Sequence, residues 1–164
     1  MKILFATAAF AAMFSTASYA ATMNFPSDAP VAAITIPDSW KPTETESGIE
    51  ATSEDQAIYF SIDVADAKTS DKVIEDAVAF LEKNGVKIDG STQQQAEDKV
   101  NGMDVTTFGW NGTDADGDVT VALAVLSPKP GKLLVITYWG SKGTQEQHGP
   151  ELDAMMTSLR PAAE

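Results

Sequence analysis

The fold of this chain is set by residues 119–139, which read VTVALAVLSPKPGKLLVITYW. Two apolar runs, at 119–126 and 132–139, flank the turn residues Pro-Lys-Pro-Gly. β-branched and aromatic residues are frequent in these runs, so each run predicts a strand, and the turn joins the two as an antiparallel pair. Both faces of each run are apolar, which is typical of strands covered on both sides. The stretch therefore predicts the centre of a sheet with one layer of structure above it and one below.

Three segments before this pair also alternate like strands. They are residues 31–36, 48–52 and 57–64. From 70 to 83 the apolar residues recur at helical spacing, and the charged residues fall mostly on the other side. Ser70 is suited to cap the start of this helix, and Asn84-Gly85 is suited to end it. The segment predicts an amphipathic helix that lies on the sheet.

Two more strands and a closing helix complete the expected layout. Residues 92–99 are polar and suit an edge strand, and the hairpin signal Asn101-Gly102 joins them to a strand at 103–110. After the central pair, apolar residues recur at helical spacing before an Arg-Pro stop: Leu152, Met155, Met156 and Leu159. The chain is therefore expected to be α+β, with a mostly antiparallel sheet covered by helices in an α/β/α sandwich.

The first twenty residues form a separate unit. A positive start is followed by an apolar run and by Ser18-Tyr19-Ala20, which places small residues at the two positions that a signal peptidase reads. The apolar run is too short to span a bilayer, and it is not followed by a cysteine that could carry a lipid. The expected division is a signal peptide at 1–20, an N-terminal tail at 21–29 and a single domain at 30–164.

Composition adds constraints on location and partners. The chain has no cysteine, so an exported fate brings no disulfides, and stability must come from apolar packing. We expect an exported protein, periplasmic or secreted. With 24 acidic and 11 basic residues the net charge is −13, and a field of that sign repels nucleic acids and anionic lipid surfaces. The expected partner is a protein or a small ligand, with no nucleic acid and no membrane insertion after cleavage.

Local motifs give this layout a resemblance to a known family. The opening strand runs into Ile-Pro-Asp-Ser-Trp at 36–40, the sequence LVITYWG occupies 134–140, and the closing helix ends Met-Thr-Ser-Leu-Arg at 156–160. This arrangement resembles the PsbP-like group of small α/β/α sandwich proteins, which includes lumenal photosystem accessory proteins and DcrB-type periplasmic proteins. The resemblance implies a PsbP-like fold and a non-enzymatic binding or assembly role. It carries no functional motif from which site residues follow.

The acidic loop is the most suggestive local feature. Asp114, Asp116 and Asp118 stand on alternate residues and can offer oxygen ligands to calcium. However, glycine occupies the fourth position of the loop instead of the sixth, and no acidic residue follows Asp118 until Glu146. Asp, Asn and Gly are also ordinary turn formers. A solvated hairpin loop and a weak calcium site are the two hypotheses, and no other cofactor is expected.

Five residues are candidates for a ligand or partner surface: Trp40, Tyr138, Trp139, Lys142 and His148. The three aromatic residues can either line a pocket or cap the core at the sheet edges. Lys142 lies in a Gly-rich turn, where it can assist an anion at a helix start, although the phosphate-loop order is lacking. His148 is the only histidine, and no Gly-x-Ser-x-Gly elbow accompanies it, so we expect a surface or capping role.

These observations favour an exported, non-catalytic binding or accessory protein. Two alternatives stay open at this point. One is a carboxylate-based hydrolase, which requires two Asp or Glu side chains that converge in a cleft. The other is a calcium-responsive binding module that uses the acidic loop.

Overall fold

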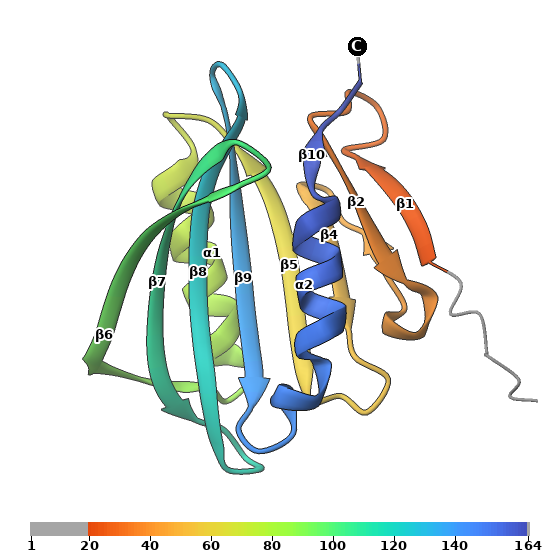
Figure 1. Cartoon of the computed structure of the whole chain (residues 1–164). Helices are drawn as coiled ribbons and strands as arrows, with labels where there is room; N and C mark the ends of the chain where they lie inside the picture. Colours follow the sequence, from red (N-terminus) through yellow and green to blue (C-terminus); the bar gives the residue numbers. More distant parts are fainter. Residues whose placement is uncertain (1–19, 164) are drawn as a thin grey trace, which may run out of the picture.

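A computed structural model describes residues 20–163, whose strands form two antiparallel sheets (Figure 1). The large sheet has the strand order β3-β4-β5-β9-β8-β7-β6. Its strands are β3 (Thr43–Glu44), β4 (Gly48–Thr52), β5 (Ile58–Ala65), β6 (Lys87–Val100), β7 (Met103–Thr113), β8 (Asp118–Lys129) and β9 (Lys132–Ser141). The small sheet has the order β1-β2-β10. Its strands are β1 (Ala20–Phe25), β2 (Ala32–Pro37) and β10 (Arg160–Pro161).

Within residues 20–163, two α-helices lie on opposite faces of the large sheet (Figure 1). The helices are α1 (Ser70–Lys83) and α2 (Gly149–Ser158), and the 3-10 turns are η1 (Asp38–Trp40) and η2 (Gln145–His148). On one face Leu81 of α1 packs with Val119 and Val121. On the other face α2 and the small sheet together form the covering layer. The expected α+β sandwich is thereby confirmed, with the addition that one outer layer contains strands as well as a helix.

The central pair lies where the sequence predicted it. β9 runs between β5 and β8, and β8 pairs with β9 in a register that places Leu126 opposite Leu134 and Val121 opposite Trp139. The polar strand β6 lies at one edge of the large sheet, as predicted. Among residues 20–163, no helix is both long enough and apolar enough to cross a membrane.

The N-terminal segment differs from the expectation. Residues 21–29 were expected to be a tail, whereas Ala20–Phe25 forms strand β1, which pairs with β2 throughout its length. The physical reason is Phe25, whose side chain is fully buried in the core and anchors the strand. Apart from Ala20, the expected signal peptide lies outside the described residues.

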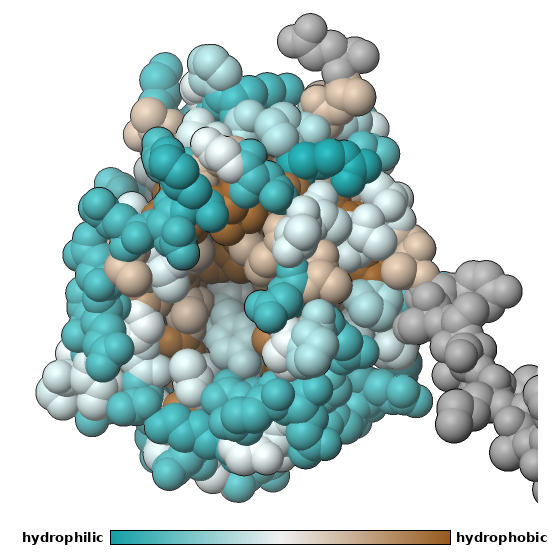
Figure 2. Space-filling model, in the orientation of Figure 1, coloured by the Kyte–Doolittle hydropathy of each residue, from teal (hydrophilic) through white to brown (hydrophobic). Residues whose placement is uncertain are grey.

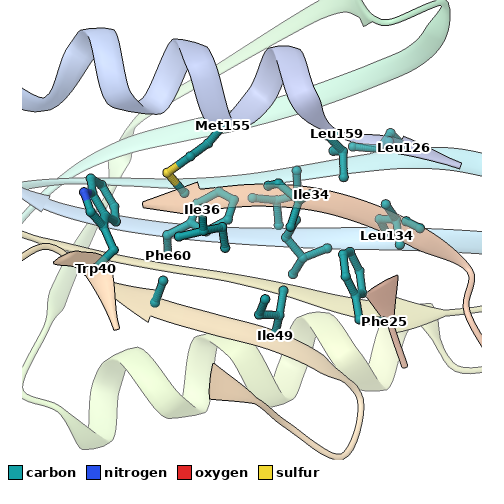
Figure 3. Close-up of a cluster of buried hydrophobic side chains, with 14 of the residues drawn as sticks. Phe25, Ile34, Ile36, Trp40, Ile49, Phe60, Leu126, Leu134, Met155 and Leu159 are labelled. Atoms are coloured by element: carbon teal, nitrogen blue, oxygen red, sulfur yellow. The ribbon is translucent and has the colours of Figure 1, made fainter. Parts of the chain in front are cut away.

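The main core fills the space between the large sheet and the layer made by α2 and β2 (Figure 3). Ile34 and Ile36 of β2, Phe60 of β5 and Met155 of α2 point into this space. Trp40 closes one end of the cluster, and its side chain is only 1% exposed. This apolar layer stabilises the domain without any disulfide.

Candidate functional site

A pocket of about 280 Å³ lies between helix α1 and the large sheet, and we name it the α1 pocket. Strands β4, β5 and β9 form its floor, and α1 forms its roof. Its polar lining comprises the carboxylates Glu50, Asp63 and Asp76 and the hydroxyl residues Thr45, Ser47, Tyr59, Ser61 and Thr137. Its apolar lining comprises Val73, Ala77 and Phe80. An acidic, hydroxyl-rich floor therefore faces a roof that is apolar apart from the carboxylate of Asp76 on α1.

Strand alternation places these groups on one side of the sheet. In β5 the apolar residues, such as Phe60 and Ile62, face the main core, while Tyr59, Ser61 and Asp63 point to the α1 side. Sequence reasoning used the apolar positions to predict the strand and overlooked the polar ones. Polar residues at alternate positions of a strand that helices cover on both sides are the signal that indicates a polar pocket.

Asp63 is a partly buried carboxylate in the floor of the α1 pocket. Its Oδ1 accepts a hydrogen bond from the hydroxyl of Ser47. Burial raises the pKa of Asp63, the hydroxyls of Ser47 and Ser61 act in the opposite direction, and the negative charge of Glu50 adds to the increase. Among residues 20–163, no Lys, Arg or His lines the pocket, and no ion pair includes Asp63 or Glu50. The floor thus holds negative charge without a protein counter-ion.

Tyr59 connects the polar floor to the aromatic edge of the pocket. Its hydroxyl donates to Glu50 Oε2 at 3.1 Å. Burial raises the pKa of Tyr59 above its ordinary value, so the hydroxyl stays protonated and remains a donor. The Tyr59 ring packs on Phe80 with ring centroids 4.8 Å apart. In the part of the chain that the structure describes, Phe80 is the one large apolar residue that is exposed to solvent, with 36% of its surface accessible.

Thr137 supplies an unsatisfied hydroxyl to the same pocket. The residue is 1% exposed, and among the described residues its Oγ1 is the one buried side-chain polar atom without a hydrogen-bond partner. It lies directly opposite Ser61 in the pairing of β5 with β9. An unpaired buried hydroxyl costs about 1–3 kcal/mol, so its position in the pocket calls for a functional explanation.

A second pocket adjoins the α1 pocket at Tyr59 and Phe80. It has a volume of about 310 Å³, shares these two residues with the α1 pocket and is lined further by Trp139 and Asp114. The indole Nε1 of Trp139 donates to Asp114 Oδ2 at 3.0 Å. The structure therefore places Trp139, a predicted surface residue, in the wall of a pocket on the α1 side of the sheet.

The acidic loop is held in a tight turn by hydrogen bonds between its own backbone and the Asp114 side chain. Asp114 Oδ1 accepts hydrogen bonds from the backbone N–H groups of Asp116, at 2.8 Å, and Gly117, at 3.1 Å. Since Oδ2 accepts from Trp139, both oxygens of this carboxylate are engaged. Within residues 20–163, no group of three His, Cys, Asp or Glu side chains is placed to hold a metal ion. Asp114, Asp116 and Asp118 thus form a hairpin turn instead of a calcium-ligand cluster.

Tyr138 and Trp40 lie on the opposite side of the sheet from Trp139. This side, which carries α2, is hydrophilic around its rim and hollowed beside α2 (Figure 2). The Tyr138 hydroxyl donates to Gln145 Oε1 at 2.7 Å, and burial raises the pKa of Tyr138 to about 12. Of the two roles that the sequence allowed for Trp40, the structure shows packing in the core, because its indole is enclosed there. Because adjacent residues of a strand point to opposite faces, Tyr138 and Trp139 lie on different sides of the sheet and cannot share one binding surface.

Lys142 lines neither the α1 pocket nor the second pocket beside Trp139. Its Nζ donates to Asn111 Oδ1 at 2.8 Å, and its backbone N–H donates to the Asp118 carbonyl at 2.9 Å. These bonds tie the turn after β9 to β7, through Asn111, and to the start of β8, through Asp118. The structure therefore gives Lys142 a connecting role, and its predicted contact with a ligand stays a prediction.

His148 joins two carboxylates near the start of α2. Its Nδ1 lies 2.6 Å from Glu151 Oε2, and its Nε2 lies 3.0 Å from Asp55 Oδ2. The hydrogen bonds to Glu151, and then to Asp55, raise the pKa of His148 above 6.5, and the pKa of Asp55 is lowered to about 2, mainly by the bond to His148. The imidazole thus links the loop before β5 to α2.

We expect the stability contribution of His148 to depend on pH. Because its pKa is raised in the folded state, the contribution is complete below about pH 6.5 and is lost as pH rises through the folded-state pKa. The difference in unfolding free energy between wild type and His148→Gln should be larger at pH 5 than at pH 9. Urea unfolding at both values measures it. As a control, Lys72→Gln, which removes an exposed ion pair, should change stability by under about 0.5 kcal/mol at both values. A His148→Gln difference that is constant with pH would contradict this assignment.

Comparison with known proteins identifies the fold. No protein-family model matches the chain, and no curated protein sequence matches it. The solved structures are informative. Cyanobacterial PsbP (CyanoP) from Synechocystis sp. PCC 6803 is similar with a TM-score of 0.60 and 9% identity, over 88% of this chain and 94% of that chain.

Two further solved structures were also matched. A protein from Bacteroides thetaiotaomicron has a TM-score of 0.53 and 13% identity over 81% of this chain, which spans 46% of that protein. LpqN, a protein involved in cell envelope biogenesis of Mycobacterium tuberculosis, has a TM-score of 0.49 and 13% identity over 88% of this chain and 91% of that chain. At these identities likeness shows the fold alone. The fold is PsbP-like, as the local motifs predicted.

Proposed function

We propose that this protein is an exported, non-catalytic binding protein that holds a small polar ligand in the α1 pocket. The observation that carries the proposal is the convergence of Glu50, Asp63 and the unpaired Thr137 hydroxyl beneath an apolar roof. Small-molecule sites combine apolar walls with a few placed polar groups in this way. The leader pattern at 1–20 and the absence of cysteine support an exported, periplasmic location.

The placement of His148 supports binding rather than catalysis. The α1 pocket contains serine hydroxyls, but a serine nucleophile needs a base, and the only histidine of the chain is held by Asp55 and Glu151 near α2. Ser47 donates to Asp63 instead. This arrangement suits a pocket that orients a ligand without breaking a bond in it.

A carboxylate-based hydrolase is the second candidate, because one observation favours it. Glu50 and Asp63 share the α1 pocket, and burial raises the pKa of Asp63, as is found for the acid of catalytic carboxylate pairs. In a hydrolase the bound compound would be converted, and Asp63→Asn would abolish that conversion. In a binding protein the compound is recovered unchanged.

The experiment expresses the full chain and recovers the protein from the osmotic-shock fraction. Thermal shift against a library of polar metabolites then finds stabilising compounds, and mass spectrometry of the mixtures detects any conversion. We expect at least one compound to raise the Tm without being converted. Val73→Phe, which fills the α1 pocket, should remove the shift. Val78→Phe is the matched control, because it lies on the same helix outside the pocket lining and should keep the shift.

Three results would overturn parts of the proposal. Conversion of a bound compound that is lost in Asp63→Asn would assign the hydrolase function instead. Retention of the thermal shift in Val73→Phe, as in Val78→Phe, would show that binding does not use the α1 pocket. Recovery of the protein only inside the cytoplasm would overturn its exported location.

A further inference from the structure

We infer that the α1 pocket binds a primary ammonium group carried on a short organic chain, as in a small diamine. This inference rests on the proposed binding function and names the ligand class for the same site. It follows from three features of the pocket: the negative charge of Glu50 and Asp63, which no described ion pair includes, the Thr137 hydroxyl without a protein partner, and the apolar side chains of the roof, where Asp76 is already paired with Lys72.

The charge of the floor requires a cation. Glu50 and Asp63 lie in a pocket that, among residues 20–163, contains no basic side chain. A partly buried carboxylate without a counter-ion is electrostatically unfavourable, and a bound cation relieves this. The chain as a whole carries a net charge of −13, which attracts cations and repels anions such as phosphates and carboxylic acids.

The hydrogen-bonding groups of the floor fit an ammonium donor. A primary ammonium has three N–H donors and no acceptor. Thr137 Oγ1 is a buried acceptor without a partner, Ser61 lies opposite it across the strand pair, and Asp63 is two residues further along β5 on the same face. An ammonium seated on this floor can therefore donate to a hydroxyl and to a carboxylate at once. Charge-assisted bonds of this kind are the strong ones.

The roof distinguishes an organic cation from a metal ion. Within the described residues, no three carboxylate or imidazole groups are placed to hold a metal. Val73, Ala77 and Phe80 instead offer apolar surface above the polar floor. Methylene groups pack on such surface while the charged end reaches polar groups, and the rings of Tyr59 and Phe80 also favour a nearby cation. A short alkyl chain that ends in an ammonium group matches both halves of the pocket.

The test compares three probes of similar length on the full chain: 1,4-diaminobutane, 1,4-butanediol and succinate. Calorimetry measures affinity, and backbone NMR shifts locate binding. We expect the diamine to bind and to shift residues of β5, β9 and α1, while the diol and the dianion do not. Asp63→Asn should weaken diamine binding at least about tenfold, since a charge-assisted bond is lost. Asp104→Asn, which removes a carboxylate that is 86% exposed on β7, should leave affinity unchanged within about twofold.

Thr137→Val separates a ligand contact from a structural contact. Valine has nearly the shape of threonine and removes a hydroxyl that makes no hydrogen bond to another protein group among the described residues. The variant should therefore have an equal or higher Tm without ligand, and it should bind the diamine about fivefold more weakly. A lower Tm would show that the hydroxyl serves the fold, and would overturn its assignment to the ligand.

The remaining outcomes separate this inference from the proposed function. Binding of the diol, blocked by Val73→Phe, would overturn the ammonium class and leave the pocket function standing. Equal weakening by Asp63→Asn and Asp104→Asn would show attraction to the overall charge, and would overturn the site-specific contact. Failure of every metabolite to bind at the pocket would overturn the proposed function itself.

Discussion

Replacing Trp40 with alanine is expected to lower the free energy of unfolding by about 3–5 kcal/mol. The indole is 1% exposed and belongs to the main core with Ile36, Phe60 and Met155 (Figure 3). Removing it leaves a cavity between the sheet and α2 that such a well-packed layer fills only partly. The substitution also removes the hydrogen bond from the indole Nε1 to Glu151 Oε2. Urea unfolding followed by circular dichroism measures the loss.

Trp110→Ala is the matched control for this substitution. Trp110 is only partly buried and stacks on Phe108, with ring centroids 6.3 Å apart, at the side of the smaller apolar cluster. Its removal should cost about 1–2 kcal/mol, because solvent already contacts part of the ring. Equal losses for the two variants would mean that Trp40 is no more buried than Trp110. A loss below about 1 kcal/mol for Trp40→Ala would contradict the core position of Trp40 and favour the pocket-lining alternative.

The sheet could be predicted because its signals are local and strong. The two apolar runs in residues 119–139 predicted strands that are covered on both faces. In the structure β8 and β9 are paired inside the sheet, and they contribute to the apolar clusters on both of its faces. Helix α1 was likewise indicated by its spacing and its Asn-Gly stop, and the structure ends it at Lys83. The small sheet was not predicted, because β1 depends on pairing with β2 and on burial of Phe25 rather than on a strong pattern of its own.

The candidate site could not be predicted in the same way. The α1 pocket combines residues of β4, β5, β9 and α1, and a single sequence does not show that Glu50, Asp63 and Thr137 meet. The predicted surface residues were chosen by type, and alternation then separated Tyr138 from Trp139. The available signal was the polar half of β5. Its meaning depends on knowing that α1 covers that face.

Gly48→Ala is expected to destabilise the protein by about 3 kcal/mol or more. A Cβ atom at this position would lie 1.9 Å from the carbonyl oxygen of Ile62 and 3.1 Å from Cα of Asp63. These are backbone atoms of β5, which pairs directly with β4, so they cannot move away without breaking the ladder. Urea unfolding measures the stability, and diamine binding measures the pocket, because Asp63 stands opposite Gly48.

Gly90→Ala makes the same chemical change in a strand without the clash. No atom lies within 4 Å of a Cβ atom at position 90. Both substitutions restrict the unfolded chain to the same extent, so the difference between the two variants isolates the backbone contact in the folded state. We expect Gly90→Ala to change stability by no more than about 0.5 kcal/mol and to keep ligand binding. If Gly48→Ala were tolerated equally well, β4 and β5 could not approach as closely as they do here. The Ser47 hydroxyl would then be too far from Asp63 to complete the floor of the α1 pocket.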